Sequence, residues 1–178
     1  MKILAFAGSN SIESINKKLV KYTLSYFNGV EINLLNLNDY EMPIFSVDRE
    51  KNGFPELVHT FLQQIQECDA IIVSLAEHNR SYTVAFKNIL DWTSRLDMNI
   101  FKNKPMLLMS TSPGGFGGGN VMNSAKPFFP KCGADVVETF SLPSFYQNFT
   151  EADGITNAEL KATFEDKVKV FKDKLGIK

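Results

Sequence analysis

Three short polar segments hold most of the side chains in this chain that could bind and orient a small ligand. The first loop (residues 8–16) reads Gly-Ser-Asn-Ser-Ile-Glu-Ser-Ile-Asn and follows the apolar run of residues 3–7. The second loop (residues 76–82) begins Ala-Glu-His-Asn, and the third loop (residues 110–119) is the most glycine-dense stretch of the sequence. Each loop comes directly after a run of apolar residues, so each is expected to follow a buried strand.

The first loop has the composition of a phosphate-binding turn. A buried strand, a small polar turn and a helix start would direct backbone N–H groups and the positive end of a helix dipole at one point. Ser9, Ser14 and Asn16 could add hydrogen bonds without crowding an anion. The same residue types also serve turns and helix caps alone, so this loop by itself leaves both interpretations open. It is not a Walker A loop, since no Gly-Lys-Ser/Thr follows, and not a dinucleotide fingerprint, since it holds a single glycine.

The other two loops are suited to a flat, polar ring. Glycines in the third loop would let the backbone come close to a ring and would offer unhindered N–H groups. The second loop would place Glu77, His78 and Asn79 beside that ring. A phosphate at one end and a flat polar ring at the other describe FMN better than a dinucleotide.

The elements that would position these loops alternate along the chain. Apolar residues three and four positions apart predict five helices, and continuous apolar runs predict strands over residues 2–7, 30–37, 69–75, 104–111 and 134–140. This alternation is typical of a parallel sheet covered on both faces. We predict one α/β domain over residues 1–178, a flavodoxin-like three-layer sandwich with a five-stranded parallel sheet of strand order 2-1-3-4-5. The three loops would then meet beyond the carboxyl ends of the strands, at the switch point between strands one and three.

Four segments are expected to depart from this regular pattern. Residues 38–53 form a long polar connection, which is typical of a lid or an interface loop. The helix expected over residues 120–132 contains Pro127 and Pro130, so we expect a kink or an early break there. Residues 141–154 indicate a polar and aromatic loop, and residues 156–159 (Thr-Asn-Ala-Glu) a capping box for the last helix.

The overall composition excludes several classes of function. With 178 residues, of which 44% are hydrophobic and 22% charged, the chain is typical of a globular protein with a sizeable core. Its net charge of -1 argues against a nucleic-acid partner, which would require a basic face. No run approaches the roughly 18–20 apolar residues of a membrane span. The apolar run after Met1 and Lys2 is too short for a secretory signal, so the cytoplasm is the expected compartment.

Isolated reactive residues carry little functional information here. Cys68 and Cys132 form no CxxC pair, and we expect both to be reduced, buried thiols. The two histidines form no cluster, so no metal site is expected. Trp92 lies on an apolar stripe typical of a core or a subunit interface, and Lys87 with Asp91, four residues on, is typical of a helix-surface pair.

The three loops, in this order, resemble the NAD(P)H-dependent FMN reductase family, which includes quinone reductases and azoreductase-like enzymes on a flavodoxin-like fold. Three segments carry the resemblance: Gly8-Ser9 with Ser14-Ile15-Asn16, then Glu77-His78-Asn79 with Phe-Lys-Asn-Ile-Leu-Asp-Trp at residues 86–92, and finally Lys104-Pro105 through Gly118. The similarity runs from residue 1 to residue 140 or so.

The resemblance implies a role for each loop. Residues of the first loop would bind the phosphate end of FMN, those of the second would border the isoalloxazine ring, and those of the third would contact its other rim and the ribityl chain. The cofactor-binding residues so implied are Ser9, Ser11, Ser14, Ile15, Asn16, Glu77, His78, Asn79, Ser112, Gly114 and Gly115.

Three positions depart from the family's usual pattern. An arginine is common where this chain has Ser11, and the second loop usually reads Pro-Glu-Tyr-Asn, whereas Ala76 and His78 replace the proline and the tyrosine. The histidine can still stack on a ring. Arg80, close by, could serve an anionic substrate or the pyridine nucleotide.

The function implied is that of a flavoenzyme. NADPH or NADH would reduce bound FMN and leave, and a small acceptor such as a quinone, an azo compound or a flavin would then take the electrons from the same ring face. No dedicated catalytic side chain is expected, because FMN carries the chemistry. Family members are dimers or tetramers, so we expect a homodimer or a homotetramer. Two alternatives remain open: a flavodoxin-like electron carrier, and a relative that has lost FMN and binds another phosphorylated ligand.

Overall fold

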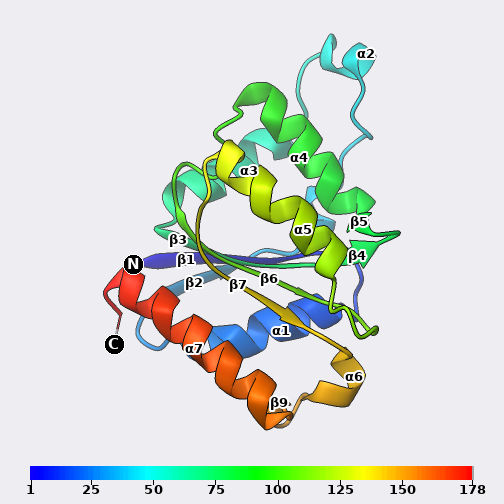
Figure 1. Cartoon of the computed structure of the whole chain (residues 1–178). Helices are drawn as coiled ribbons and strands as arrows, with labels where there is room; N and C mark the ends of the chain where they lie inside the picture. The colour runs from blue at the N-terminus through cyan, green and yellow to red at the C-terminus, as the bar shows by residue number, and fades with distance from the viewer. Residues whose placement is uncertain (178) are drawn as a thin grey trace.

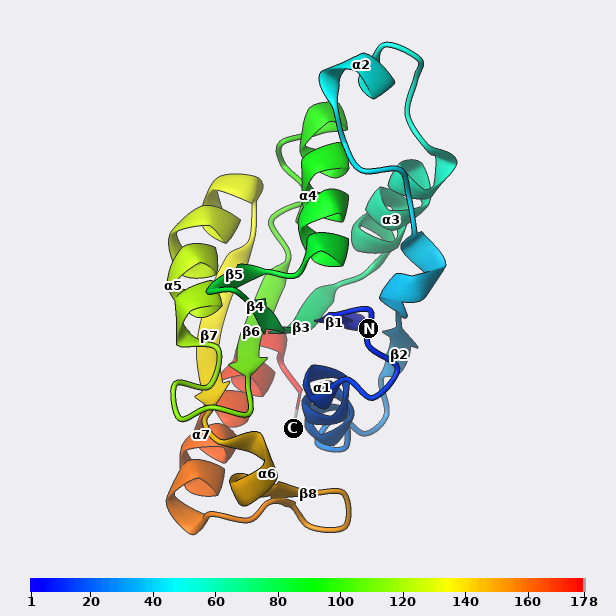
Figure 2. The same ribbon diagram turned by 90° about the vertical axis from the view of Figure 1, so that its right-hand side faces the viewer.

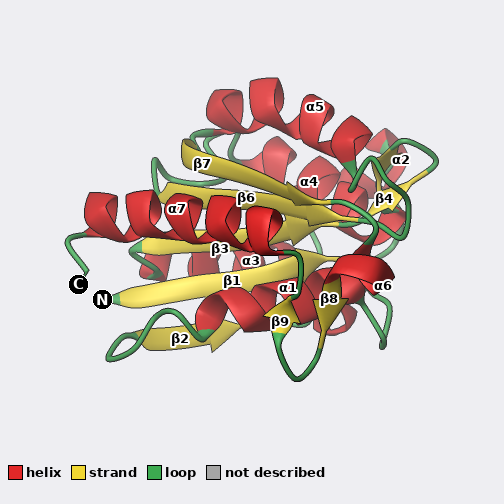
Figure 3. Cartoon of the chain, turned by 60° about the horizontal axis from the view of Figure 1, so that its bottom comes forward, coloured by secondary structure: helices red, strands yellow, loops and turns green. Residues whose placement is uncertain are grey.

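A five-stranded parallel sheet forms the centre of the molecule in the computed structural model, which describes residues 1–177. Its strands are β1 (Lys2–Gly8), β2 (Glu31–Leu34), β3 (Ala70–Leu75), β6 (Pro105–Thr111) and β7 (Asp135–Leu142). They lie in the order β2-β1-β3-β6-β7, and every pair in this sheet is parallel (Figures 1 and 3). The predicted flavodoxin-like order 2-1-3-4-5 is therefore confirmed.

Helices cover both faces of the sheet (Figure 1). On one face lie α1 (Ile15–Leu24) and α7 (Ala158–Leu175), and on the other α3 (Glu56–Glu67), α4 (Val84–Leu96) and α5 (Gly119–Phe128). Strand β1 shows why two layers form, because its successive side chains point to opposite faces. Leu4 and Phe6 belong to the apolar cluster under α3, α4 and α5, whereas Ile3 and Ala5 belong to the cluster under α1 and α7.

The long connection after β2 is more ordered than its sequence indicated. It contains a 3-10 turn, η1 (Leu37–Tyr40), and a short helix, α2 (Val47–Glu50). Helix α4 anchors it through two side chains. The Asn88 side chain bonds to the backbone of Met42, Pro43 and Phe45, and Trp92 Nε1 donates to Pro43 O over 2.7 Å. Trp92 is thus a buried core residue that also fixes this segment.

The remaining short elements surround the carboxyl edge of the sheet. The second loop folds into a small hairpin of β4 (Glu77–His78) and β5 (Ser81–Tyr82). The segment expected to be a polar and aromatic loop contains α6 (Phe145–Asn148) and a second hairpin, β8 (Phe149–Thr150) and β9 (Gly154–Ile155). These pairings lie at local turns that the apolar periodicity did not reveal.

Several local predictions can be compared directly with the structure. Helix α5 ends at Phe128 and continues as the 3-10 turn η2 (Phe129–Cys132), so the early break expected from the two prolines is confirmed. The last helix is capped by Asn157, whose side chain accepts two backbone N–H bonds, rather than by a capping box on Thr156. Cys68 and Cys132 are buried and free. Over residues 1–177, no helix is both long and apolar enough to cross a membrane.

Candidate functional site at the carboxyl edge of the sheet

The three polar loops meet at the carboxyl ends of β1, β3 and β6 (Figure 2). Two bonds hold the first loop against its neighbours. Thr83 Oγ1, at the start of α4, donates to Gly8 O over 2.9 Å. Asn16 Nδ2, in the first turn of α1, donates to Thr111 O over 3.1 Å. The predicted convergence of the loops is therefore present in the fold.

The first loop presents donors at the amino end of α1. Ser14 is the N-cap of this helix, and its Oγ accepts the Lys17 N–H over 3.2 Å. Ser9 Oγ accepts the Ser11 N–H over 3.2 Å, which leaves the Ser9 hydroxyl proton free to donate. The backbone N–H groups of Ile15 and of the residue after it precede the first intrahelical bonds of α1. The first turn of α1 contains no acidic residue.

The side chain of Asn16 is turned into the protein rather than toward the loop surface. It is 2% exposed, and its Oδ1 accepts the Thr111 N–H over 3.1 Å and the Ser74 hydroxyl over 2.7 Å. With the bond from its Nδ2, the Asn16 amide makes three bonds to β3 and β6. Any contact of Asn16 with a phosphate in this arrangement would therefore come from its backbone N–H.

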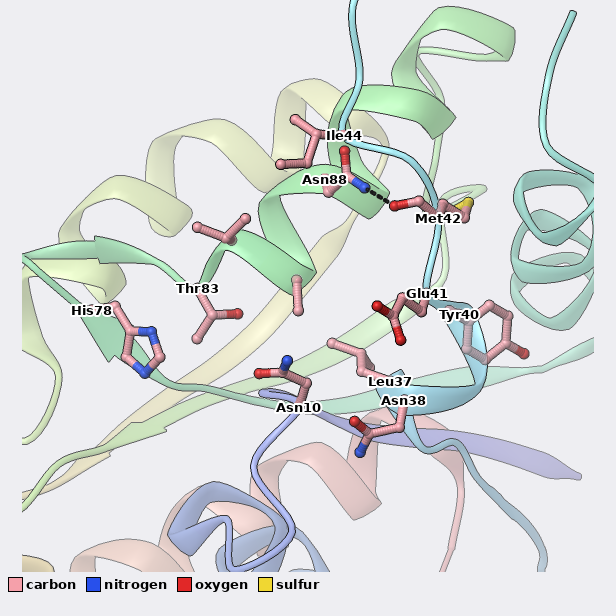
Figure 4. A pocket seen from close by; sticks show the side chains of 12 residues that line it. Asn10, Leu37, Asn38, Tyr40, Glu41, Met42, Ile44, His78, Thr83 and Asn88 are labelled. Carbon is pink, nitrogen blue, oxygen red and sulfur yellow. Dashed lines mark hydrogen bonds between the residues drawn. The ribbon is translucent and has the colours of Figure 1, made fainter. Parts of the chain in front are cut away.

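The second loop turns sharply at its tip. Asn79 and Arg80 are the two turn residues between β4 and β5, with φ values of 50° and 64°. Both residues thus lie in the left-handed region that a type I′ hairpin turn requires. Asparagine tolerates this conformation, but arginine adopts it only at a cost. His78 immediately precedes the turn, and its exposed side chain points toward Asn10 of the first loop (Figure 4).

Glu77 joins the second loop to helix α5. Its Oε2 accepts the Val121 N–H over 2.9 Å, and its Oε1 accepts Asn120 Nδ2 over 3.0 Å. The carboxylate therefore caps the amino end of α5 from outside the helix, where Gly118 supplies no side-chain cap. This position favours negative charge, because unpaired N–H groups and the helix dipole point toward it. The amino end of α5 is thus already occupied by a carboxylate of the protein.

Hydrogen bonds hold the third loop in place, one from a side chain within the loop and two from the residues after β7. Ser112 Oγ accepts the Gly118 N–H over 3.1 Å, and Phe145 donates its N–H to Ser112 O over 3.1 Å. Ser144, itself at φ 46°, donates its N–H to Gly114 O over 2.9 Å. A Cβ placed on Gly114 or Gly115 would meet no atom closer than 3.9 Å. The backbone of these two glycines therefore faces open space.

A pocket of about 260 Å³ lies between the first loop, the connection after β2 and the start of α4 (Figure 4). Asn10 and His78 form one side of it, and Asn38 and Glu41 lie across from them. Its lining contains no lysine and no arginine. This pocket opens beside the first and second loops, away from the glycines of the third.

Sequence reasoning missed three residues that shape this edge. Asn10 lines the pocket, Thr83 bonds the second loop segment to β1, and Ser144 braces the third loop. Thr83 could have been found, because a threonine directly before an amphipathic helix is a typical N-cap. Ser144 gives no such signal, since its role depends on a contact with a loop about thirty residues earlier.

The arrangement fits a cofactor with an anionic end and a flat ring. Hydroxyl and N–H donors meet at the amino end of α1, where no carboxylate of the first helical turn competes with an anion. The open backbone at Gly114 and Gly115 leaves room for a ring to approach. FMN has both features, so the residues present fit FMN.

The family model of the NADPH-dependent FMN reductases matches residues 1–148. The chain belongs to this family. Among FMN reductase relatives, an NADPH:quinone oxidoreductase of Arabidopsis thaliana is 33% identical over 124 residues, which are 67% of this chain and 61% of that protein. An NAD(P)H-dependent FMN reductase of Pseudomonas aeruginosa is 30% identical over 118 residues, or 66% of this chain and 63% of that protein. The match thus spans about three fifths of the length of these curated relatives.

Solved structures agree with the family assignment. The flavoenzyme NAD(P)H:(acceptor) oxidoreductase FerB from Paracoccus denitrificans has a TM-score of 0.76 and 26% identity, with 97% of this chain and 95% of that chain covered. An azoreductase from Bacillus anthracis has a TM-score of 0.69 at 17% identity, with 97% of this chain and 99% of that chain covered. At this low identity, the similarity supports the fold and nothing further.

Proposed function

We propose that this protein binds FMN at the carboxyl edge of its sheet and acts as an NAD(P)H-dependent reductase of a small acceptor. Quinones are the acceptor class that the names of the relatives favour. The observation that carries the proposal is the contrast between two helix ends. Glu77 occupies the amino end of α5, whereas the amino end of α1 has hydroxyl donors and no acidic residue in its first turn.

The chain's own residues would divide the work of holding FMN. Ser9, Ser14 and the first N–H groups of α1 would bind the phosphate, together with the neighbouring Ser11 and Ile15. The Ser14 hydroxyl proton remains free for this, because its oxygen accepts the Lys17 N–H. Asn16 would act by holding the end of β6, and hence the third loop, in place.

The ring would lie between the second and third loops. His78 is exposed beside the pocket and would border one edge, with the backbone of Asn79 next to it. Gly114 and Gly115 would offer N–H groups to the other rim, while Ser112 keeps that loop closed. Glu77 would contribute its backbone, since its carboxylate already bonds to α5.

The chemistry that bound FMN would supply is the transfer of a hydride equivalent from the nicotinamide and of two electrons to the acceptor. The protein's part is to bind, orient and set the local charge. N–H groups at Gly114 and Gly115 would stabilise negative charge that develops on the ring, as fixed dipoles do in other active sites. No side chain at this edge needs to donate or remove a proton for that task.

Two further properties belong to the same proposal. We infer a homodimer or homotetramer, as the family resemblance implies, and the exposed apolar side chains of Ile44 and Val84, which line the pocket, support this inference. The two free, buried cysteines suit a reducing compartment, which supports the cytoplasm as the location.

The test begins with the visible spectrum of the purified protein, repeated after FMN and then NADPH are added without oxygen. A reductase should bind FMN and lose its absorbance in one step on addition of NADPH. Accumulation of a stable one-electron form would instead indicate an electron carrier. Absence of FMN binding would contradict the proposal and favour a relative with another phosphorylated ligand.

A variant pair tests the proposed phosphate contacts. Ser9→Ala with Ser14→Ala should weaken FMN binding tenfold or more, since two donors to an anion are lost. Ser124→Ala is the control, because its exposed hydroxyl on α5 bonds only to Asn120 O. Equal FMN affinity in the double variant and the control would count against this phosphate site.

A further inference from the structure

The segment that follows β7 packs directly against the third loop. Figure 2 shows α6 close to the loop that joins β6 to α5. Thr111 Oγ1 donates to Leu142 O over 2.8 Å. The Phe145 N–H donates to Ser112 O over 3.1 Å. A Cβ on Gly117, which has a φ of 59°, would lie 2.9 Å from the backbone of Leu142, so this close approach requires glycine. The two segments therefore hold a fixed position relative to each other.

Two serine hydroxyls border the open backbone of Gly114 and Gly115. A Cβ built on Gly114 would have Ser112 Oγ as its nearest non-adjacent neighbour, at 4.0 Å. A Cβ built on Gly115 would have Ser144 Oγ in the same position, at 3.9 Å. A ligand that lies against the backbone of the two glycines would therefore approach both hydroxyls.

Of these two hydroxyls, only that of Ser144 lacks a partner. Ser112 Oγ accepts the Gly118 N–H over 3.1 Å and donates to Gly114 O over 3.3 Å. Ser144 is the N-cap residue of α6, yet its side chain makes no capping bond, and Ser144 Oγ makes no other hydrogen bond within residues 1–177. Its side chain is half-buried. The proton and the lone pairs of this hydroxyl are therefore available to a ligand.

The neighbours of Ser144 hold it in a conformation that serine rarely adopts. Its φ of 46° and ψ of 57° lie in the left-handed region, which glycine enters more readily. On one side, Phe145 is 3% exposed and stacks on Phe149 with ring centres 4.6 Å apart. On the other side, Asn148 Nδ2 donates to Pro143 O over 2.9 Å. The hydroxyl thus projects from a fixed backbone, and little ordering is left to be done when it binds a ligand.

We infer that the Ser144 hydroxyl donates a hydrogen bond to the polar rim of the flavin ring and raises the reduction potential of the ring. The inference rests on the proposed function, which places that rim against Gly114 and Gly115. Reduction adds negative charge to the ring, and a hydrogen bond to a charged acceptor is stronger than one to a neutral acceptor. The hydroxyl therefore favours the reduced form. This role is separate from bracing the third loop, which the Ser144 N–H performs through its bond to Gly114 O.

The experiment compares Ser144→Ala and Ser144→Gly with the wild type. Both variants lose the hydroxyl and keep the N–H that bonds to Gly114 O, but only glycine also relieves the left-handed backbone. Ser25→Ala is the control, because the exposed Ser25 hydroxyl bonds to Tyr22 O at the other end of α1.

Three quantities are measured for each protein. The first is the Kd for oxidised FMN. The second is the midpoint potential of bound FMN, from an anaerobic titration with dithionite against a reference dye. The third is the urea midpoint of the flavin-free protein, which reports effects on the fold alone.

Loss of the hydroxyl should affect the flavin equally in the two Ser144 variants. Each should bind oxidised FMN about threefold more weakly, and its affinity for reduced FMN should fall about tenfold further. That tenfold difference corresponds to a fall of about 30 mV in the two-electron midpoint potential. The urea midpoint should rise in Ser144→Gly and stay near the wild-type value in Ser144→Ala, so stability does not account for the effect on the flavin. The control should keep all three wild-type values.

Two results overturn the inference. An unchanged midpoint potential in both Ser144 variants would mean that the hydroxyl does not contact the ring. A lower potential in Ser144→Ala that is absent from Ser144→Gly would assign the effect to the backbone rather than to the hydroxyl. Failure of the proposed function looks different, because the wild type would then bind no FMN, and the inference would fall with it.

Discussion

Replacement of Asn16 by alanine should destabilise the protein even when no flavin is present. The amide of Asn16 satisfies three buried polar groups, which are the Thr111 N–H, the Thr111 carbonyl and the Ser74 hydroxyl. Ser74 and Thr111 are themselves 0% and 1% exposed. Water therefore cannot easily replace the lost partners.

The magnitude follows from the three groups. A buried polar group left without a partner costs about 1–3 kcal/mol. The Ser74 hydroxyl can rotate toward another acceptor, so we expect a total loss of about 3 kcal/mol in the free energy of unfolding. For a chain of this size, that corresponds to a fall of roughly 6–12 °C in Tm.

Urea unfolding of the flavin-free protein measures this loss. Asn10→Ala is the matched control, because Asn10 lies in the same loop but is exposed, and its stability should change by less than about 0.5 kcal/mol. A second measurement, the affinity for FMN, separates two roles for Asn16. If its side chain bound the phosphate directly, Asn16→Ala would weaken FMN binding and leave the stability of the flavin-free protein nearly unchanged. That result would refute the assignment of Asn16 as a buried link between α1 and β6.

Four further substitutions test other parts of the same edge. Tyr82→Phe should stabilise the fold by about 1 kcal/mol, because the Tyr82 hydroxyl is buried without a partner among residues 1–177. Burial also raises the pKa of Tyr82 to about 12, whereas the unfolded chain ionises this tyrosine at its ordinary pKa of about 10. The free energy of unfolding of the wild type should therefore fall as the pH rises above about 10. Urea unfolding of Tyr82→Phe should not show the part of this fall that comes from Tyr82. Arg80→Gly should raise the urea midpoint, since φ of 64° costs arginine about 1 kcal/mol, whereas Asn79→Gly should change it less. Glu77→Gln should lower the free energy of unfolding by about 1 kcal/mol through loss of the charge at the amino end of α5, and an unchanged value would contradict the capping role.

The sequence predicted the layout of the fold because that layout depends on repeated local patterns. Continuous apolar strands such as residues 70–73 indicate a parallel sheet with both faces covered, and the rule of right-handed crossovers then limits the possible strand orders, among them the one observed. The positions of the three loops follow from the same pattern, since each loop comes directly after a parallel strand. What could be predicted of the candidate site was therefore which segments come together, and the predicted cofactor contacts themselves remain predictions.

The directions of individual side chains could not be predicted in this way. Asn16 and Ser14 are both polar residues at a helix start, yet Asn16 turns inward to Thr111, which lies 95 residues later. Glu77 turns away from the loop surface toward Val121, 44 residues later. Each orientation depends on an unpaired group that only the folded chain brings near. The β8–β9 hairpin was missed for a related reason, because two strands of two residues each show no periodicity.

The contrast between the two helix ends also gives the candidate site a direction. A carboxylate at the amino end of α5 stabilises that helix and at the same time repels a second anion. In the proposed site, the anionic end of FMN would therefore be repelled from the side of the third loop and would bind at α1, where Ser14 caps the helix and no acidic residue lies in the first turn. The uncharged ring would then lie toward the glycines at 114 and 115, where the backbone is open. Glu77 would thus orient FMN without touching it, because it has already filled the competing anion site.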